Sequence, residues 1–117
     1  MSYRTSNISW SQLQTSRDDL VAALFYAQQL SMARDSAGNP ITFVATNSST
    51  IRVQESAADV GNDYPVTFAR GVVLTAPVAF PFTLTYDKLG RTNATTFTLS
   101  GGGNSVDVVV SGSGYAR

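Results

Sequence analysis

The sequence contains no cysteine and no histidine. Without cysteine there is no disulfide framework, no thiol nucleophile and no thiolate metal site. Without histidine the chain lacks the commonest general base and the commonest metal ligand. The closest pair of carboxylates, Asp18 and Asp19, is adjacent and would face different sides of a helix. We therefore expect a non-catalytic protein that uses no cofactor.

Charge is also scarce. Charged residues make up 14% of the chain, against about 25% in typical soluble domains. Eight basic residues balance eight acidic ones, and no basic run is present. Sequence-independent binding of nucleic acid needs several clustered cations, so we do not expect nucleic acid as a partner. The single lysine and the many Ser, Thr, Asn and Gly residues favour an extracytoplasmic, β-rich protein.

Long apolar runs are absent as well. A membrane-spanning helix needs about 20 consecutive apolar residues, and no such run and no signal peptide occurs here. A length of 117 residues predicts a single domain, residues 1–117. We expect an irregular start or helix lead-in over residues 1–14, a helix over 15–34 and a β region over 41–117.

The predicted helix has recognisable ends. Ser16 followed by Asp19 is a weak capping box, and Gly38 and Pro40 stop the helix. Around a helical wheel the apolar residues form two arcs. The wider arc should pack on a sheet and contains Leu13, Leu20, Ala23, Leu24, Ala27 and Leu30. The second arc contains Val21, Phe25 and Met32, and it either contacts other subunits or lies under a loop or a second sheet of the same chain.

After Pro40 the apolar period changes to two, which predicts short antiparallel strands. Residues 41–46 and 51–54 should form a first hairpin, and residues 57–64 a polar loop. The apolar segment 72–82 is interrupted by prolines, so we expect it at a sheet edge or in a crossover. It either covers the core or binds a partner. The fold class is therefore α+β, with a long N-terminal helix on antiparallel sheets and a tendency to a two-sheet β-sandwich.

Two stretches carry a family resemblance. Residues 22–34 are similar to an L-x-x-A-R-x-x-A helix, and residues 82–91 (FTLTYDKLGR) to an I-x-F-D-x-x-G-R strand and turn. A Thr-rich strand, a Gly/Asn turn, a Val-rich strand and a terminal Gly-Tyr-Ala-Arg follow in the same order. Over residues 16–117 the chain resembles the GspH/FimT minor pseudopilins of the type IV pilin superfamily, and within them the minor pilins of mannose-sensitive haemagglutinin (MSHA-type) pili.

The resemblance implies a non-catalytic subunit that packs into or primes a type IV pilus or a type II secretion pseudopilus. Its partners would be other pilin subunits. It also implies a methylated, hydrophobic N-terminal half-helix that anchors the protein in the bacterial inner membrane, with the globular domain in the periplasm. That half-helix and its docking glutamate are missing from this sequence, so we expect a soluble domain with an added starting methionine. Val21, Phe25 and Met32 are then the expected subunit interface.

The alternative is a binding module at a fibre tip, for carbohydrate or DNA. Trp10, Tyr64 or Tyr115 would support it if they formed an aromatic platform. Some FimT-type proteins bind DNA through a basic G-R-x-R motif, which here reads Gly114 to Arg117 with Tyr115 in place of the first arginine. Arg91, Tyr115 and Arg117 are the candidate ligand contacts, although so few cations do not favour DNA.

Three polar segments have a second interpretation. Residues 59–63 place oxygen ligands at Ca²⁺-like spacing, but a bidentate glutamate at the right distance is missing, so a polar turn is favoured. The sequons at Asn47 and Asn93 are common in Ser/Thr-rich chains, and we expect turns there.

Overall fold

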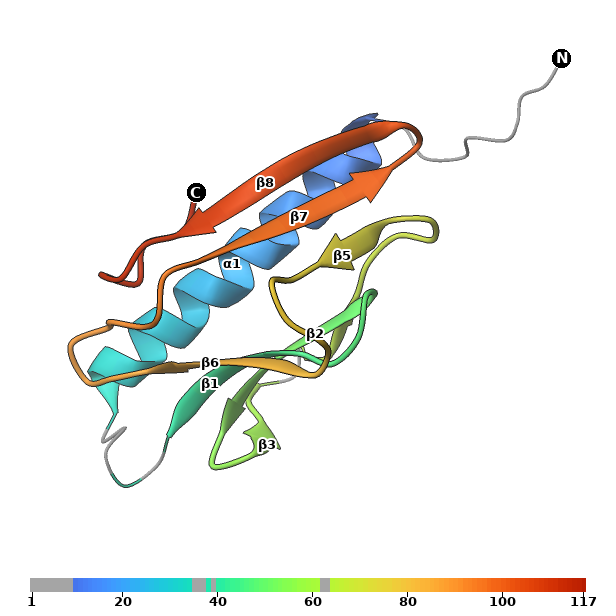
Figure 1. The fold of residues 1–117 in the computed structure, drawn as a ribbon. Helices are drawn as coiled ribbons and strands as arrows, with labels where there is room; N and C mark the ends of the chain where they lie inside the picture. The colour runs from blue at the N-terminus through green and yellow to red at the C-terminus, as the bar shows by residue number, and fades with distance from the viewer. Residues whose placement is uncertain (1–9, 35–37, 39, 62–63) are drawn as a thin grey trace, which may run out of the picture.

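The computed structural model describes residues 10–34, 38, 40–61 and 64–117, and its fold is α+β (Figure 1). One long helix packs against two antiparallel sheets, one of five strands and one of three. This confirms the predicted fold class. The elements are α1 (Trp10–Ala33), β1 (Ile41–Ala45), β2 (Thr50–Glu55), β3 (Ala58–Asp59), β4 (Val66–Thr67), β5 (Val73–Thr75), β6 (Phe82–Tyr86), β7 (Thr95–Gly101) and β8 (Asn104–Val110).

Helix α1 begins at Trp10, five residues before the predicted start at residue 15, and it ends one residue earlier than predicted. The predicted capping role of Ser16 is wrong. Ser16 is buried inside the helix, and its hydroxyl donates a hydrogen bond to the carbonyl oxygen of Gln12 at 3.0 Å. A serine in a helix interior satisfies its hydroxyl in this way, four residues back. Residues 10–14 are therefore a full part of the helix.

The five-stranded sheet is built around the predicted hairpin of β1 and β2. Its order is β3-β2-β1-β6, and β4 also pairs with β2. Phe43 on β1 lies opposite Val53 of β2 on one side and Leu84 of β6 on the other. All three side chains are buried. Along β1 the burial alternates, because alternate residues of a strand point to the same face of the sheet. The period-two pattern thus identifies the face that meets the helix.

The predicted polar loop over residues 57–64 is wrong at its start, because Ala58 and Asp59 form strand β3. A two-residue turn, Ser56 and Ala57, joins β2 to β3, and both residues have positive φ angles, 51° and 69°. Turns of this kind usually contain Asn-Gly or Asp-Gly, so nothing in the sequence indicated a hairpin. Strand β3 is held by its Asp59 carboxylate, which accepts hydrogen bonds from Arg52 at 2.7 Å and Gln54 at 3.2 Å.

The three-stranded sheet has the order β5-β7-β8. The proline-interrupted segment 72–82 contributes the edge strand β5 to this sheet and then crosses to β6, the edge of the other sheet. This confirms the prediction that the segment lies at a sheet edge or in a crossover. Prolines avoid central strands because a proline has no N–H to donate to a neighbouring strand.

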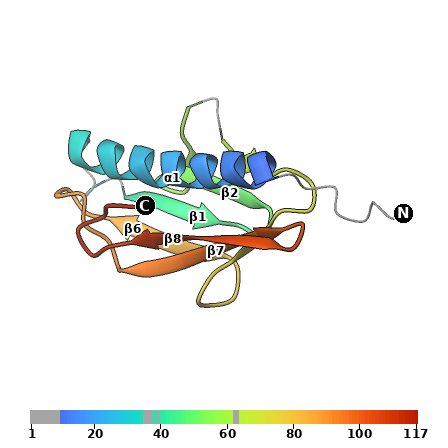
Figure 2. The same cartoon turned by 90° about the horizontal axis from the view of Figure 1, so that it is seen from above.

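Helix α1 lies over both sheets, as the view from above shows (Figure 2). Every residue of the predicted wider arc is buried, and each buried leucine contributes about 1.5–3 kcal/mol of hydrophobic stabilisation. Beneath the helix, Phe97 of β7 joins the two sheets, with ring contacts to Phe43 at 5.6 Å and Phe82 at 5.5 Å between centroids. The core therefore leaves the opposite side of α1 to the surface.

Candidate functional site

The second arc of α1 is only partly available as a surface. Phe25 is 54% exposed and Met32 is 45% exposed, whereas Val21 is half-buried and packs against the core. Val21 thus contributes to the packing of the fold, whereas the two larger side chains remain in solvent. No loop among the described residues buries Phe25 or Met32. Their role as a subunit interface stays a prediction.

An exposed ridge runs along α1 through Phe25 and Met32. Asp18, Phe25 and Met32 are spaced seven residues apart, which is close to two helical turns, and all three are exposed. We call these three residues the outer ridge. It carries a negative charge toward the N-terminus of the helix and two large apolar side chains beyond it. This line of residues could contact another helix along its length.

The connection between β6 and β7 packs against the C-terminal end of the outer ridge. A Cβ added to Gly90 would lie 3.0 Å from Sδ of Met32 and 3.1 Å from Cγ of Gln28, and Gly90 has a φ of +79°. Both the close approach and the positive φ favour glycine at this position. Its neighbour Leu89 is 64% exposed. The D-x-x-G-R motif therefore positions a turn directly beside Met32.

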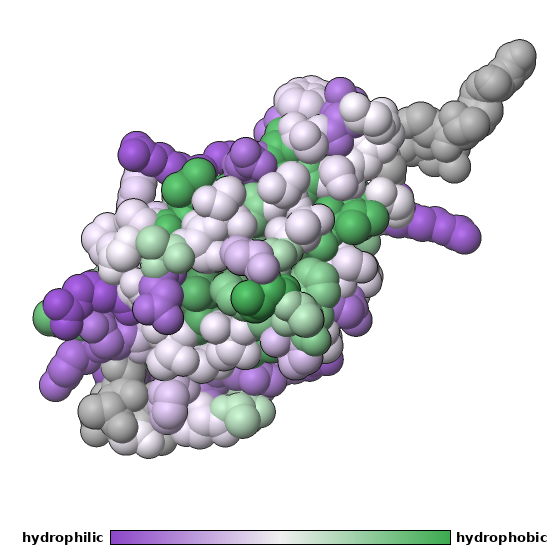
Figure 3. Space-filling model, viewed as in Figure 1, coloured by the Kyte–Doolittle hydropathy of each residue, from purple (hydrophilic) through white to green (hydrophobic). Residues whose placement is uncertain are grey.

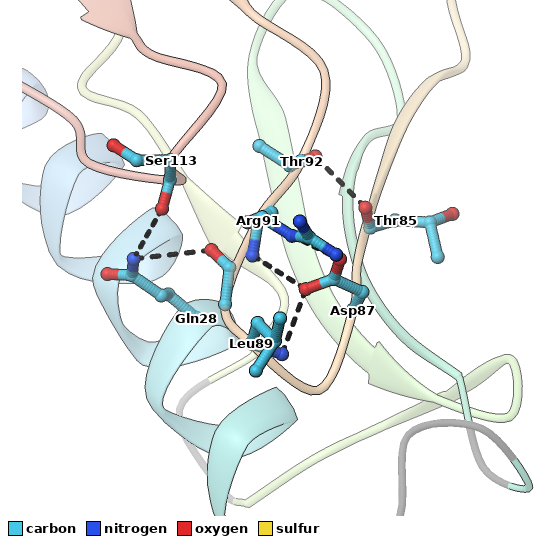
Figure 4. A network of polar contacts seen from close by, with 8 residues as sticks. Gln28, Thr85, Asp87, Leu89, Arg91, Thr92 and Ser113 are labelled. Atoms are coloured by element: carbon cyan, nitrogen blue, oxygen red, sulfur yellow. Dashed lines mark hydrogen bonds and ion pairs between the residues drawn. The ribbon is translucent and has the colours of Figure 1, made fainter.

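The carboxylate of Asp87 organises this turn (Figure 4). Its Oδ1 accepts hydrogen bonds from the backbone N–H groups of Leu89 and Arg91, and its Oδ2 accepts one from Nε of Arg91, each at 2.9 Å. These hydrogen bonds lower the pKa of Asp87 below its usual value of 3.8. The bond from the backbone N–H of Arg91 has the largest effect, and those from the Arg91 side chain and the Leu89 N–H follow. Arg91, a candidate ligand contact, is thus already engaged within the turn.

Gln28 joins the helix to two distant segments (Figure 4). Its Nε2 donates hydrogen bonds to the carbonyl oxygens of Gly90 at 3.3 Å and Ser113 at 3.2 Å. The chain after β8 turns back on itself, and Arg117 exchanges two backbone hydrogen bonds with Val109, at 2.8 and 3.0 Å. We call Gln28, the turn at Gly90 and the tail from Ser111 to Arg117 the C-terminal clasp. Sequence reasoning missed Gln28, because a lone glutamine beside an apolar arc gives no signal.

The other two candidate ligand contacts lie on the tail of this clasp. Tyr115 is 57% exposed, and the guanidinium carbon of Arg117 lies 5.8 Å from the centre of its ring. This distance fits a cation–π contact. Thr92, which follows Arg91, donates its N–H to the carbonyl oxygen of Gly112 at 3.3 Å. The structure therefore joins the backbones of the turn and the tail.

Trp10, Tyr64 and Tyr115, which would have supported a binding module, do not form one aromatic platform. The ring of Tyr64 stacks on Tyr26 of α1, at 5.9 Å and 14°. Trp10 lies about 27 Å along the helix from Gln28. Gln28 is the helix residue that hydrogen-bonds to the tail on which Tyr115 lies. Because the three residues belong to different parts of the molecule, they cannot hold one ligand together.

The proposed calcium-like segment gives no ligand set in the described residues. Asp59 uses both carboxylate oxygens within the sheet, as described above, while Asn62 and Asp63 of this segment lie outside the described residues. No group of three or more acidic side chains that could hold a metal ion occurs in the part of the chain that the structure describes. At the first sequon, Oδ1 of Asn47 accepts the N–H of Ser49 at 2.9 Å, which confirms a turn.

Polar and apolar side chains are unevenly distributed over the surface. On the face viewed in Figure 3, hydrophilic groups gather over the β6–β7 turn, and apolar groups cluster nearer the middle of the molecule. The β6–β7 turn is thus a polar end of the molecule on this face.

Comparison with protein-family models, curated proteins and solved structures finds no significant match for this chain. The arrangement itself, an N-terminal helix packed on antiparallel sheets, resembles that of pilins. Among the described residues, no helix has both the length and the apolar character needed to cross a membrane.

Proposed function

We propose that this chain is the globular domain of a minor pilin or pseudopilin, a non-catalytic subunit that packs into or primes a type IV pilus or a type II secretion pseudopilus. One observation carries the proposal. Helix α1 buries one side completely in the fold, yet it exposes Phe25 and Met32 on the other. The two side chains lie on the same side of the helix, about 10 Å apart along its axis. Exposed apolar surface that forms a large patch commonly marks a protein contact.

The physical role of the helix follows from its two sides. The buried side fixes α1 to both sheets, so the outer ridge is presented on a rigid support. Burial of Phe25 or Met32 against a neighbouring subunit would contribute about 1.5–3 kcal/mol for each side chain if it became fully buried. The C-terminal clasp holds the turn at Gly90 beside Met32, so the turn and the ridge would meet a partner together.

In this proposal the partners are other pilin or pseudopilin subunits. A hydrophobic segment preceding α1 would anchor the protein in the bacterial inner membrane, and the globular domain would lie in the periplasm before assembly. Anchored in this way, all copies would share the same helix direction.

The proposal is tested by placing charges on the outer ridge. In cells that assemble the fibre, the full-length protein with Phe25→Glu and Met32→Glu should accumulate normally but be lost from sheared, purified fibres. The matched control is Val78→Glu, another exposed apolar residue that lies between β5 and β6, and it should be incorporated like the wild type. Normal incorporation of the ridge variant would contradict the proposal.

A fibre-tip binding module remains the second candidate function, and the exposed Tyr115 beside Arg117 favours it. An aromatic ring and a cation together can bind a sugar face or a nucleotide base. We expect Arg117→Ala to leave the retention of duplex DNA at low salt unchanged. A clear loss of retention would favour this second function.

A further inference from the structure

Strand β8 has an outer edge that is only partly covered. Its inner edge pairs with β7 in a continuous register from Asn104 to Val110. Among the described residues, its outer edge meets only the tail, where Arg117 exchanges two backbone hydrogen bonds with Val109. In Figure 1, β8 forms the upper margin of the three-stranded sheet, and it lies toward the viewer in Figure 2. The outer edge is therefore closed at the end of β8 and open over residues 104–108.

The hydrogen bonds of Val109 show which backbone groups of β8 point outward. Its N–H and its C=O both bond to Arg117, so they point away from β7. This direction repeats at every second residue of an antiparallel strand, so the N–H and C=O groups of Ser105 and Asp107 point to the same open edge. These four groups have no partner within residues 10–34, 38, 40–61 and 64–117. An extended chain lying along β8 would satisfy them.

The edges of the other strands are interrupted by the fold itself. On β5, the N–H of Leu74 donates to the carbonyl oxygen of Ser48 at 2.8 Å. On β6, the carbonyl oxygen of Thr85 accepts the Thr92 hydroxyl at 3.0 Å. Strands β3 and β4 have two residues each. Residues 104–108 of β8, in contrast, form a continuous open stretch, and an unpaired strand edge is a template for another chain.

The side chains of β8 define the chemistry of a segment that would pair with it. Asp107 is exposed, its Oδ1 accepts the Thr98 hydroxyl at 2.8 Å, and it forms no ion pair with any described residue. The cation of the tail, Arg117, lies over the ring of Tyr115. On the other face of β8, Val106 is half-buried against the core. Because directly opposite residues of paired strands touch, a basic residue suits the position opposite Asp107 and an apolar one the position opposite Val106.

We propose that the open edge of β8 binds an extended segment of another protein, which extends the three-stranded sheet and places a basic residue opposite Asp107. Arg117 already pairs with this edge as an extended chain, and the added segment continues the same row of hydrogen bonds. A second copy pairing through its own β8 is a poorer partner, because β8 contains no cation and would bring a second Asp107. The inference goes beyond the proposed function and does not depend on it.

Amide hydrogen exchange tests the open edge directly. In the free chain the N–H groups of Ser105 and Asp107 should exchange rapidly, whereas those of Val106 and Val108, which point to β7, should be protected. The probe is the palindromic peptide acetyl-Thr-Val-Lys-Val-Thr-amide, which presents the same pattern in either strand direction. At roughly millimolar concentration, where weak binding is detected, it should slow exchange at Ser105 and Asp107 and shift their NMR signals. If neither change occurs, the inference is overturned.

The charge of the probe provides the second measurement. A probe with glutamate in place of lysine should bind the wild type roughly fivefold more weakly, the scale of one exposed cross-strand charge pair. Asp107→Lys should reverse this preference. Equal binding of the two probes by the wild type, or an unchanged preference in Asp107→Lys, overturns the inference.

The third measurement separates backbone pairing from charge attraction. Asp107→Pro removes an N–H that points outward, which an edge strand tolerates, whereas Asp107→Asn removes only the charge. The proline variant should lose binding of the lysine probe, and the asparagine variant should keep it with at most a roughly fivefold loss. A lysine probe that is N-methylated at its lysine nitrogen should also lose binding, and this result does not depend on how the proline variant folds. Retained binding of the N-methylated probe overturns the inference.

Self-association of the free chain is the remaining outcome. Sedimentation without the probe should show a monomer. A dimer in which the amides of Ser105 and Asp107 become protected would identify a second copy as the partner and overturn the inference. The proposed function is judged separately, because the fibre incorporation of the Phe25→Glu, Met32→Glu variant leaves β8 unchanged.

Discussion

Gly114 lies so close to Gly90 that a Cβ on Gly114 would be 1.8 Å from the Gly90 carbonyl oxygen. The same Cβ would lie 2.8 Å from Nε2 of Gln28. The tail, the turn and the helix thus meet at a point with no room for a side chain. This contact explains why glycine occurs at position 114.

The first prediction concerns this contact. Gly114→Ala should lower the free energy of unfolding by at least about 2 kcal/mol, because a methyl group would collide with backbone and the residue has a φ of +90°. Gly103→Ala is the matched control, since Gly103 has a similar φ of +82° but no atom near its Cβ position. It should lose only about 1 kcal/mol, from backbone strain. Equal losses in urea unfolding would contradict the role of the clasp.

The second prediction concerns the turn between β2 and β3. Ser56 and Ala57 both adopt positive φ without the residues that favour it. Replacing them with Asn-Gly should raise the free energy of unfolding by about 1 kcal/mol, because Asn-Gly suits this turn. Ala58→Gly, in the following strand, should instead destabilise by about 0.5–1 kcal/mol. A destabilised Asn-Gly variant would show that the turn is not strained.

The third prediction concerns Tyr86, which is 1% exposed and whose hydroxyl has no hydrogen-bond partner among the described residues. Burial raises the pKa of this phenol above its usual 10.0. Tyr86→Phe should leave the free energy of unfolding unchanged or raise it by about 1 kcal/mol, because it removes an unsatisfied buried group. Tyr115→Phe, at an exposed ring, should have no effect. A clear loss of stability in Tyr86→Phe would contradict the structure.

The fourth prediction concerns pH. The pKa of Asp87 is lower in the folded state than its usual 3.8, so its contribution to stability is present above that pH and is lost as the pH falls through the folded pKa. Asp87→Ala should therefore lower the melting temperature at neutral pH, and its difference from the wild type should shrink as the pH falls through the folded pKa of Asp87. Lys88→Ala, in the same turn, should show no such pH dependence. A constant difference at all pH values would contradict this.

The regular parts of the fold could be predicted from the sequence because they follow local periods. The spacing of Leu13, Leu20 and Leu24 identified the buried side of the helix, and the alternation around Phe43 identified the inner face of the first hairpin. Both patterns depend on the geometry of a single element.

The remaining features depend on contacts that the sequence does not reveal. The hydrogen bonds of Gln28 join residues 62 and 85 positions away, and no local pattern indicates them. The hairpin turn at Ser56 and Ala57 lacks the usual turn residues. A helical wheel places Val21 outside the buried arc, although its side chain packs against the core. The helical pattern alone therefore does not predict this contact.

The most direct test of the proposed function is photo-crosslinking from position 25. A photoreactive amino acid would replace Phe25 in the full-length protein, and a second variant would carry it at Val109, an exposed apolar position on β8. After illumination of fibre-assembling cells, position 25 should form adducts with fibre subunits and position 109 should form far fewer. If position 25 formed no adduct with any fibre subunit, the assembly function of the outer ridge would be contradicted.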